Sequence, residues 1–198
     1  MRQILIISSG GRWPPGTFDG EIWGLGTLWK RVKLDRTFEL HDRETVENLP
    51  AASKPHELAA LGIPVYMQER HPEVPLSIAY PLAEVSRRFR RYFTGTVAYL
   101  LGLAAYEHVT GQPIARVLLR SVHCGHAATE YAGQKACFDY WCGVLEGLGI
   151  EIIMPSDCWL ARPYPWQPEP YGYGEWDVAA DQVLTAAVRQ IMGVKHAA

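Results

Sequence analysis

The chain has 198 residues, a length typical of one compact domain rather than two. Nineteen Lys and Arg residues against 21 Asp and Glu residues give a net charge of −2, which excludes the basic field needed for non-specific nucleic-acid binding. Apolar residues make up 48% of the chain, a composition that excludes a disordered protein and favours a folded core.

The termini and the cysteines indicate the compartment. The apolar run Ile4–Ile7 is too short for a signal-peptide core, and the longest uncharged stretch, residues 92–106, is too short to span a bilayer. Cysteines at positions 124, 137, 142 and 158 form no CxxC pair, which favours reduced thiols over disulfides. We therefore expect a cytoplasmic protein with no membrane partner.

The first half of the chain contains short apolar runs separated by loops. Gln3–Ser8 is a β-branched apolar run that stops at two glycines, a pattern typical of a buried parallel strand. Prolines and glycines predict a loop over residues 10–20. Glu21–Leu25, Thr37–His41 and Ile63–Met67 are the next predicted strands, and prolines make the last a candidate edge strand.

The second half alternates helices and strands at the spacing of a doubly wound sheet. Residues 81–108 are predicted helical, and their part from Thr94 to Tyr106 is apolar all round, which predicts a buried helix. The remaining predicted elements are a strand over 115–122, a helix over 128–148, a strand over 150–154 and a helix over 176–192.

These elements predict one Rossmann-like α/β domain over residues 1–198, with a mainly parallel sheet and helices on both faces. A Pro- and aromatic-rich segment, residues 155–175, is expected to form an ordered arm because linkers rarely contain so many aromatic residues. The residues expected to be buried in the sheet are Ile4, Ile6, Val117, Leu119, Ile150 and Ile152.

Small residues follow the first predicted strand. In open α/β sheets, ligands bind at the carboxyl ends of the strands. Ser8, Ser9 and Gly10 let backbone amides approach a phosphate or carboxylate, so they are predicted ligand-binding residues, with a plain tight turn as the alternative. His41 also follows a strand, and the carboxylates of Glu39 or Asp42 could orient its imidazole toward a ligand, with an inert loop histidine as the alternative.

A second candidate site lies where the buried helix begins. Thr94 is the expected N-cap, and Gly95 and Thr96 leave room for an anion at the first free amides, with simple capping as the alternative. The basic residues just before them could meet a phosphate or an acidic partner, although such a run is also typical of a solvated face. These residues are Arg87, Arg88, Arg90 and Arg91.

The stretch Ser121–His126 and the following helix contain the side chains best suited to catalysis. His123, His126 and Glu130 are predicted catalytic residues because imidazole and carboxylate groups transfer protons at neutral pH. Gln134 lies one turn beyond Glu130 on the same helical face and is a predicted ligand-binding residue. The spacing of the histidines does not match a structural zinc site, so no metal ligand is assigned; metal binding and a solvated loop stay open as alternatives.

The order of these features resembles an uncharacterised Rossmann-like family of bacteriophage and prophage proteins. The resemblance covers about residues 3 to 160 and, more distantly, the layout is similar to 6-hydroxymethylpterin pyrophosphokinase-like proteins and bacterial sialyltransferases. It implies a nucleotide or nucleotide-sugar ligand. The stretches that carry it are the glycine/serine loop, Glu21–Leu25, Phe38–His41, Pro64–Met67, Tyr92–Tyr99, Glu130 with Gln134, Tyr140–Gly143 and Gly149–Ile150.

Two functions follow from these observations. The first is a nucleotide-dependent transferase that moves a glycosyl or pyrophosphoryl group, with phosphate held by the small loops. The second is a non-catalytic protein that sequesters a nucleotide or contacts a host protein through the aromatic segment Trp159–Trp176. The sequence does not identify a cofactor, and it leaves open whether the protein forms a homo-oligomer. A similar fold does not by itself identify the reaction.

Overall fold

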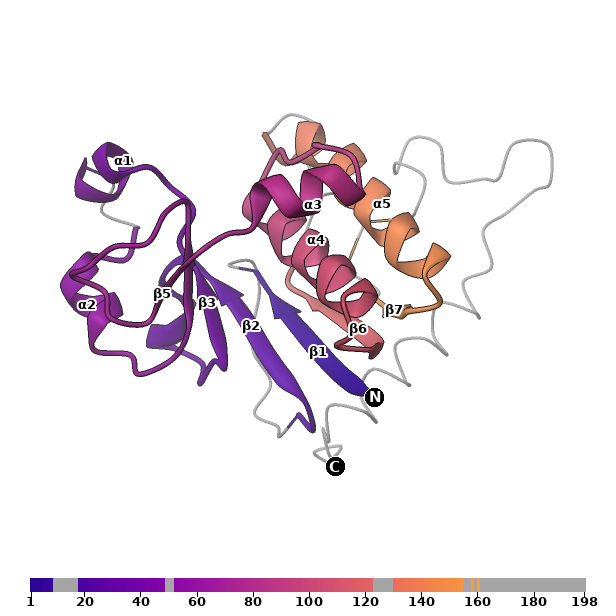
Figure 1. The fold of residues 1–198 in the computed structure, drawn as a ribbon, viewed down its shortest axis with the longest axis horizontal. Coiled ribbons are helices and arrows are strands. Elements are labelled where there is room, and N and C mark those ends of the chain that lie inside the picture. Colours follow the sequence, from indigo (N-terminus) through magenta and orange to yellow (C-terminus); the bar gives the residue numbers. More distant parts are fainter. Residues whose placement is uncertain (9–17, 49–51, 123–129, 155–157, 159, 161–198) are drawn as a thin grey trace, which may run out of the picture.

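The computed structural model describes residues 1–8, 18–48, 52–122, 130–154, 158 and 160, with the backbone alone for Arg43, Glu47 and residues 130–132. The strands of this part form one parallel sheet in the order β5-β4-β3-β2-β1-β6-β7 (Figure 1). They are β1 Arg2–Ile7, β2 Glu21–Leu25, β3 Arg36–Phe38, β4 Val65–Met67, β5 Ser77–Ala79, β6 Ile114–Arg120 and β7 Glu151–Ile153.

Helices pack on both faces of this sheet. One face carries α3, α4 and α5, which lie together in Figure 1, while the 3₁₀ helix η1 and α2 pack on the other through Leu28 and Leu58. No helix in the described residues is long and apolar enough to cross a membrane. The helices are η1 Gly26–Lys30, α1 Arg43–Asn48, α2 Pro55–Ala59, α3 Leu82–Arg88, α4 Thr96–Val109 and α5 Glu130–Gly147.

The core confirms the predicted fold class, a parallel α/β sheet with helices on both faces. Five of the six residues expected inside the sheet are buried, and the sixth, Ile152, is half-buried because β7 lies at the edge. The predicted buried helix is α4, whose residues are buried on most sides. The predicted C-terminal helix and most of the aromatic arm lie outside the described residues; Cys158 and Leu160, at the start of that arm, are buried in the core.

The prediction that residues 63–67 form an edge strand is wrong. The strand, β4, lies between β3 and β5 and pairs with both. Pro64 precedes it, and the Pro64 carbonyl accepts a hydrogen bond from the Thr37 amide at 3.0 Å, so the missing proline N–H leaves the pairing intact. The true edge on this side is β5, a strand of three residues that the sequence pattern did not predict.

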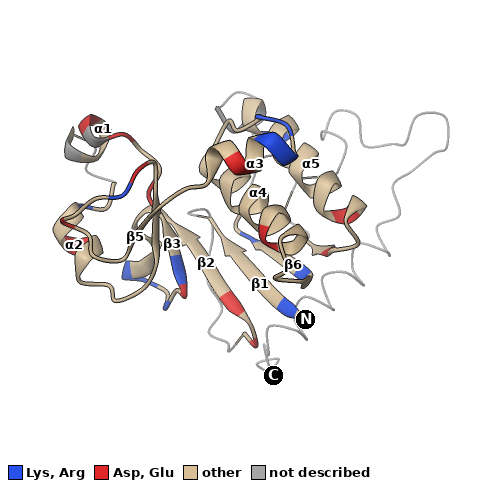
Figure 2. Cartoon of the chain, in the orientation of Figure 1, with Lys and Arg blue, Asp and Glu red and all other residues tan. Residues whose placement is uncertain are grey.

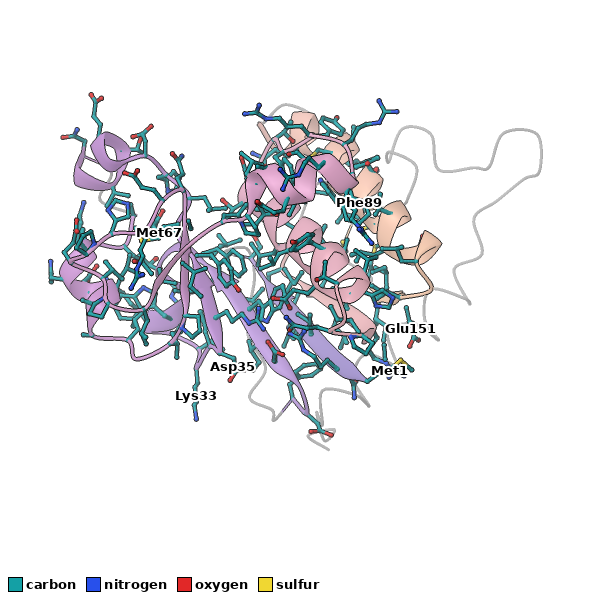
Figure 3. All side chains as sticks on the ribbon, in the orientation of Figure 1. Met1, Lys33, Asp35, Met67, Phe89 and Glu151 are labelled. Atoms are coloured by element: carbon teal, nitrogen blue, oxygen red, sulfur yellow. The ribbon has the colours of Figure 1, made fainter. Side chains whose placement is uncertain are left out.

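A network of ion pairs lies at the amino-terminal edge of the sheet. Arg2, Glu21 and Arg36 stand at the starts of β1, β2 and β3, and both arginines pair with Glu21. They also pair with Glu107, near the end of α4, at 2.9 and 2.5 Å. Figure 2 shows basic and acidic segments side by side here, and Figure 3 shows Met1, Asp35 and Glu151, which precede or begin strands, along the same edge. The network fixes α4 antiparallel to the strands.

This network makes the stability of the fold sensitive to acid. Burial acts to raise the pKa of Glu21, but the Trp23 hydrogen bond and the charges of Arg36 and Arg2 outweigh it and lower the pKa from its usual 4.5. The stabilisation by Glu21 is therefore complete above pH 4.5 and is lost as the pH falls below it.

We expect Glu21→Gln to unfold at lower urea concentration than the native chain at neutral pH, since it removes the charge that pairs with both arginines. The difference should shrink as the pH is lowered below 4.5, because the native carboxylate then becomes neutral too. Urea titrations of both proteins at neutral and acid pH measure this. A difference that stays constant or grows in acid would contradict it.

Candidate functional site

The strand order reverses at β1. Strands β2 to β5 extend from one side of β1, and β6 and β7 extend from the other. At the carboxyl ends the Ser8 amide donates to the Arg120 carbonyl at 3.0 Å, so the ends of β1 and β6 are held together. Ligands of open α/β sheets bind at such a reversal because the loops on either side diverge there. Of the predicted first-loop residues, Ser8 lies here, and Ser9 and Gly10 lie outside the described residues.

Ser121 directly follows β6 at this reversal and has an unusual backbone. Its φ is +56°, and no other non-glycine residue in the described part has positive φ. Serine pays a steric cost in this conformation, and such residues gather at functional sites. Its side chain is buried, with 6% exposed. The chain therefore bends as it leaves β6, and the predicted catalytic residues His123 and His126 lie outside the described residues.

The start of α4 lies at the same edge of the sheet. Because Glu107 joins the strand starts, the opposite end of α4 lies at the carboxyl ends, and Val97 and Val122 are buried in one core cluster. The prediction that Thr94 is the N-cap is wrong. Gly95 occupies that position, and no side chain caps the helix. The reason is that Gly95 is extended, with φ −173°, and its carbonyl accepts the first bond, from Ala98. The first amides, including that of Thr96, are thus left to solvent or a ligand.

Gln134, a residue of α5, lies close to the start of α4. A Cβ on Gly95 would lie 2.7 Å from the Gln134 Oε1 atom and 3.1 Å from the Phe138 ring. Only glycine lets the Gln134 amide approach the backbone this closely. Glu130 opens α5 one turn earlier, so its backbone lies at the same edge; its side chain is not described.

An arginine and two aromatic residues flank this helix start in the chain. Burial raises the pKa of Tyr99, one turn into α4, and the positive charge of Arg91 acts in the opposite direction. Arg91 and Thr94 are both exposed. Tyr99 stacks on Phe93 with ring centres 4.5 Å apart. Uncapped amides at a helix start suit an anionic group such as a phosphate.

The segment before α4 is fixed to α5. The Tyr92 carbonyl accepts hydrogen bonds from the Trp141 indole at 2.7 Å and from the Cys137 thiol at 3.1 Å. Trp141 is completely buried, and its ring contacts Phe89, which Figure 3 labels between α3 and α5. The backbone that presents Thr94 and Gly95 is therefore held by the core.

A carboxylate and an imidazole meet at the carboxyl end of β3. Glu39 is buried, with 1% of its side chain exposed, and its Oε1 atom lies 2.5 Å from Nδ1 of His41. Its Oε2 atom accepts the Ser53 amide at 3.0 Å, and Ser53 in turn donates its hydroxyl to the Gly26 carbonyl. The alternative carboxylate, Asp42, accepts the Thr45 amide instead. Glu39 is thus the residue that orients His41, whose ring is 45% exposed.

Sequence reasoning missed three parts of this edge. Ser53 carries no motif, and its role appears only when the loop before α2 folds against β3. Tyr99 is one of many apolar residues in its helix, and nothing in the sequence separates it from the core. Ser121 lies in the predicted stretch, but its positive φ depends on how the chain leaves the sheet.

The metal-binding alternative gains no support from the described residues, where no three His, Cys, Asp or Glu side chains come together to hold an ion. Cys137, Cys142 and Cys158 are buried and form no disulfide with one another. The fold and this edge together define a doubly wound α/β protein with polar groups gathered where the strand order reverses. Comparisons with protein-family models, with curated proteins and with solved structures find no match to this chain.

Proposed function

We propose that the chain binds a nucleotide or nucleotide sugar at the carboxyl edge of the sheet and transfers its glycosyl or pyrophosphoryl group to an acceptor. The observation that carries the proposal is the strand-order reversal at β1, where Ser8 and Ser121 lie at the ends of joined strands. Ligands of this fold class bind at that place.

The helix start supports the choice of a phosphorylated ligand. The amides at the start of α4 have no side-chain cap, so negative charge is favoured there. The choice of a nucleotide donor over another phosphate rests on the resemblance described from the sequence.

The test is ligand-induced stabilisation. ATP, UDP-glucose and CMP-N-acetylneuraminate sample the nucleotide and nucleotide-sugar classes. A ligand at a hundred times its Kd should add about 2.7 kcal/mol, which raises Tm by about 5 to 10 °C for a chain of this size. If none of the three shifts Tm at millimolar concentration, the proposed function is wrong.

Gly95→Val should abolish the Tm shift, because its side chain would displace Gln134 and cover the first amides of α4. Far-UV circular dichroism checks that the helices persist, because the added side chain meets the buried Phe138 ring as well as the far end of the Gln134 side chain. Gly143→Ala is the matched control: nothing lies within 4 Å of the added Cβ and the residue is exposed in α5, so this variant should keep the full shift. An undiminished shift in Gly95→Val would remove the start of α4 from the site.

A further inference from the structure

The Glu39–His41 pair has the arrangement of a proton-transfer device. An ionised carboxylate has only acceptor atoms, so the short contact from its Oε1 atom to Nδ1 places the ring proton on Nδ1. In the neutral ring the other nitrogen, Nε2, then carries a lone pair and can accept a proton. A carboxylate that fixes the tautomer and orientation of an imidazole in this way makes the ring a better base.

Glu39 is buried whereas His41 is exposed, and this difference favours a catalytic role for the pair. Removing a carboxylate from water is costly, and Glu39 is nearly completely buried. One of its oxygens is bonded to the backbone of Ser53, which ties down the loop before α2. The other is bonded to a ring that is 45% exposed and therefore adds little buried area to the fold. The first bond fixes the backbone, whereas the second satisfies the other buried oxygen and at the same time orients an exposed imidazole.

The pair also lies on the ligand side of the sheet. Glu39 follows β3 directly, and its amide continues the strand pairing by donating to the Tyr66 carbonyl. Strand β3 is two positions from β1 in the sheet, which is about 10 Å at the usual strand spacing. A donor whose phosphate lies at the reversal can therefore extend its transferable group toward His41.

We propose that His41 is a catalytic base of the transfer reaction and that Glu39 is its positioning residue; this rests on the proposed function. The acceptor hydroxyl gives its proton to Nε2 of His41, and its oxygen forms a bond to the electrophilic carbon or phosphorus of the donor. The bond from that atom to the nucleotide phosphate oxygen breaks, and the nucleotide leaves with the electron pair. Water can replace the acceptor, in which case the donor is hydrolysed.

Donor hydrolysis is the assay. Each donor that shifts Tm is incubated with the protein, and released UDP, CMP or AMP is measured by chromatography. His41→Ala should lower the rate by a factor of about 10² to 10⁴, the size of a lost general base, while the Tm shift by the donor persists. Glu39→Gln should lower it by about 10 to 100 with the same Tm shift, because the ring keeps its place but loses its charged partner.

Added imidazole separates a catalytic role from a structural one. His41 is exposed enough for a free imidazole to enter the space left in His41→Ala, so imidazole in the buffer should restore part of the rate. His71→Ala is the control: His71 also pairs with a glutamate, at 3.5 Å, but in the loop between β4 and β5, and its loss should leave the rate unchanged.

The outcomes separate the two proposals. If no donor binds, the proposed function is wrong, and this inference is wrong with it. If a donor binds but none is hydrolysed, or if His41→Ala hydrolyses it at close to the native rate, the binding function stands and the role of His41 is wrong. A loss in His41→Ala that imidazole does not restore, together with a lower melting temperature, would assign the pair to structure alone.

Discussion

Glu107→Leu is expected to lower the free energy of unfolding by about 3 to 5 kcal/mol, the usual cost of removing one partner from a buried ion-pair network. Glu107 accepts hydrogen bonds from both Arg2 and Arg36, and its side chain is only 8% exposed. Leucine fills the space but leaves both guanidinium groups in a poorly hydrated place with Glu21 as their remaining carboxylate. Urea denaturation at neutral pH measures the loss.

Two further variants test whether the loss of stability comes from the charge that Glu107→Leu leaves unpaired. Arg36→Met combined with Glu107→Leu should recover part of the lost stability, because it removes the charge that the single change leaves unpaired. Glu151→Gln, which breaks an exposed pair with Arg116 on the edge of the sheet, should change the stability by no more than about 0.5 kcal/mol. A double variant less stable than Glu107→Leu would show that packing of Arg36 on Trp23, rather than charge, holds this edge.

Trp141→Ala should lower the free energy of unfolding by about 3 to 5 kcal/mol, the range for truncating a large buried aromatic residue. Its ring is completely buried and contacts Phe89, Phe93 and Tyr140. Trp141→Phe keeps most of the ring but loses the indole N–H that reaches the Tyr92 carbonyl, so we expect a smaller loss of about 1 to 3 kcal/mol.

The phenylalanine variant also connects stability to the candidate site. With the indole bond gone, the segment that presents Thr94 and Gly95 is held less firmly, so the nucleotide-induced Tm shift should fall along with the stability. Tyr140→Phe is the control, since it removes only an exposed hydrogen bond to the Arg90 amide, and it should leave both quantities almost unchanged. A native Tm shift in Trp141→Phe would show that this bond does not position the site.

The elements that the sequence predicted well are those with a strong local pattern. The run Ile4–Ile7 is continuously apolar and the strand Ile114–Arg120 is apolar except at Arg116 and Arg120, because both lie inside the sheet. Helix α4 is apolar on most sides because it is buried. Strand β5 has three residues, two of them exposed, and helix α2 has five, so neither has a pattern long enough to detect. The prolines near β4 led to the prediction of an edge strand, because the sequence does not show that the Pro64 carbonyl pairs with the neighbouring strand.

The candidate site was predictable as a set of residue types but not as a set of contacts. Small residues, a histidine after a strand and a glycine at a helix start are local signals. The approach of Gln134 to Gly95 and the bond from Ser53 to Glu39 join parts of the chain that are distant in sequence, and only the packing of the helices on the sheet creates them. The N-cap was misassigned because threonine is the better capping residue, whereas close packing with α5 favours glycine there.

The place of β1 between β2 and β6 sets the order in which the chain can assemble. Strand β2 follows β1 after one loop, whereas β6 comes from the second half of the chain. Until Ile114–Arg120 has been synthesised, one side of β1 presents unpaired amides and carbonyls on an apolar strand, which is the kind of edge that pairs with other chains. Pairing over such a separation is slow because loop closure costs entropy before the new contacts stabilise the chain. The nascent protein thus passes through a stage in which the unpaired edge of β1 must be shielded from other chains. This stage ends when β6 emerges from the ribosome and pairs with β1.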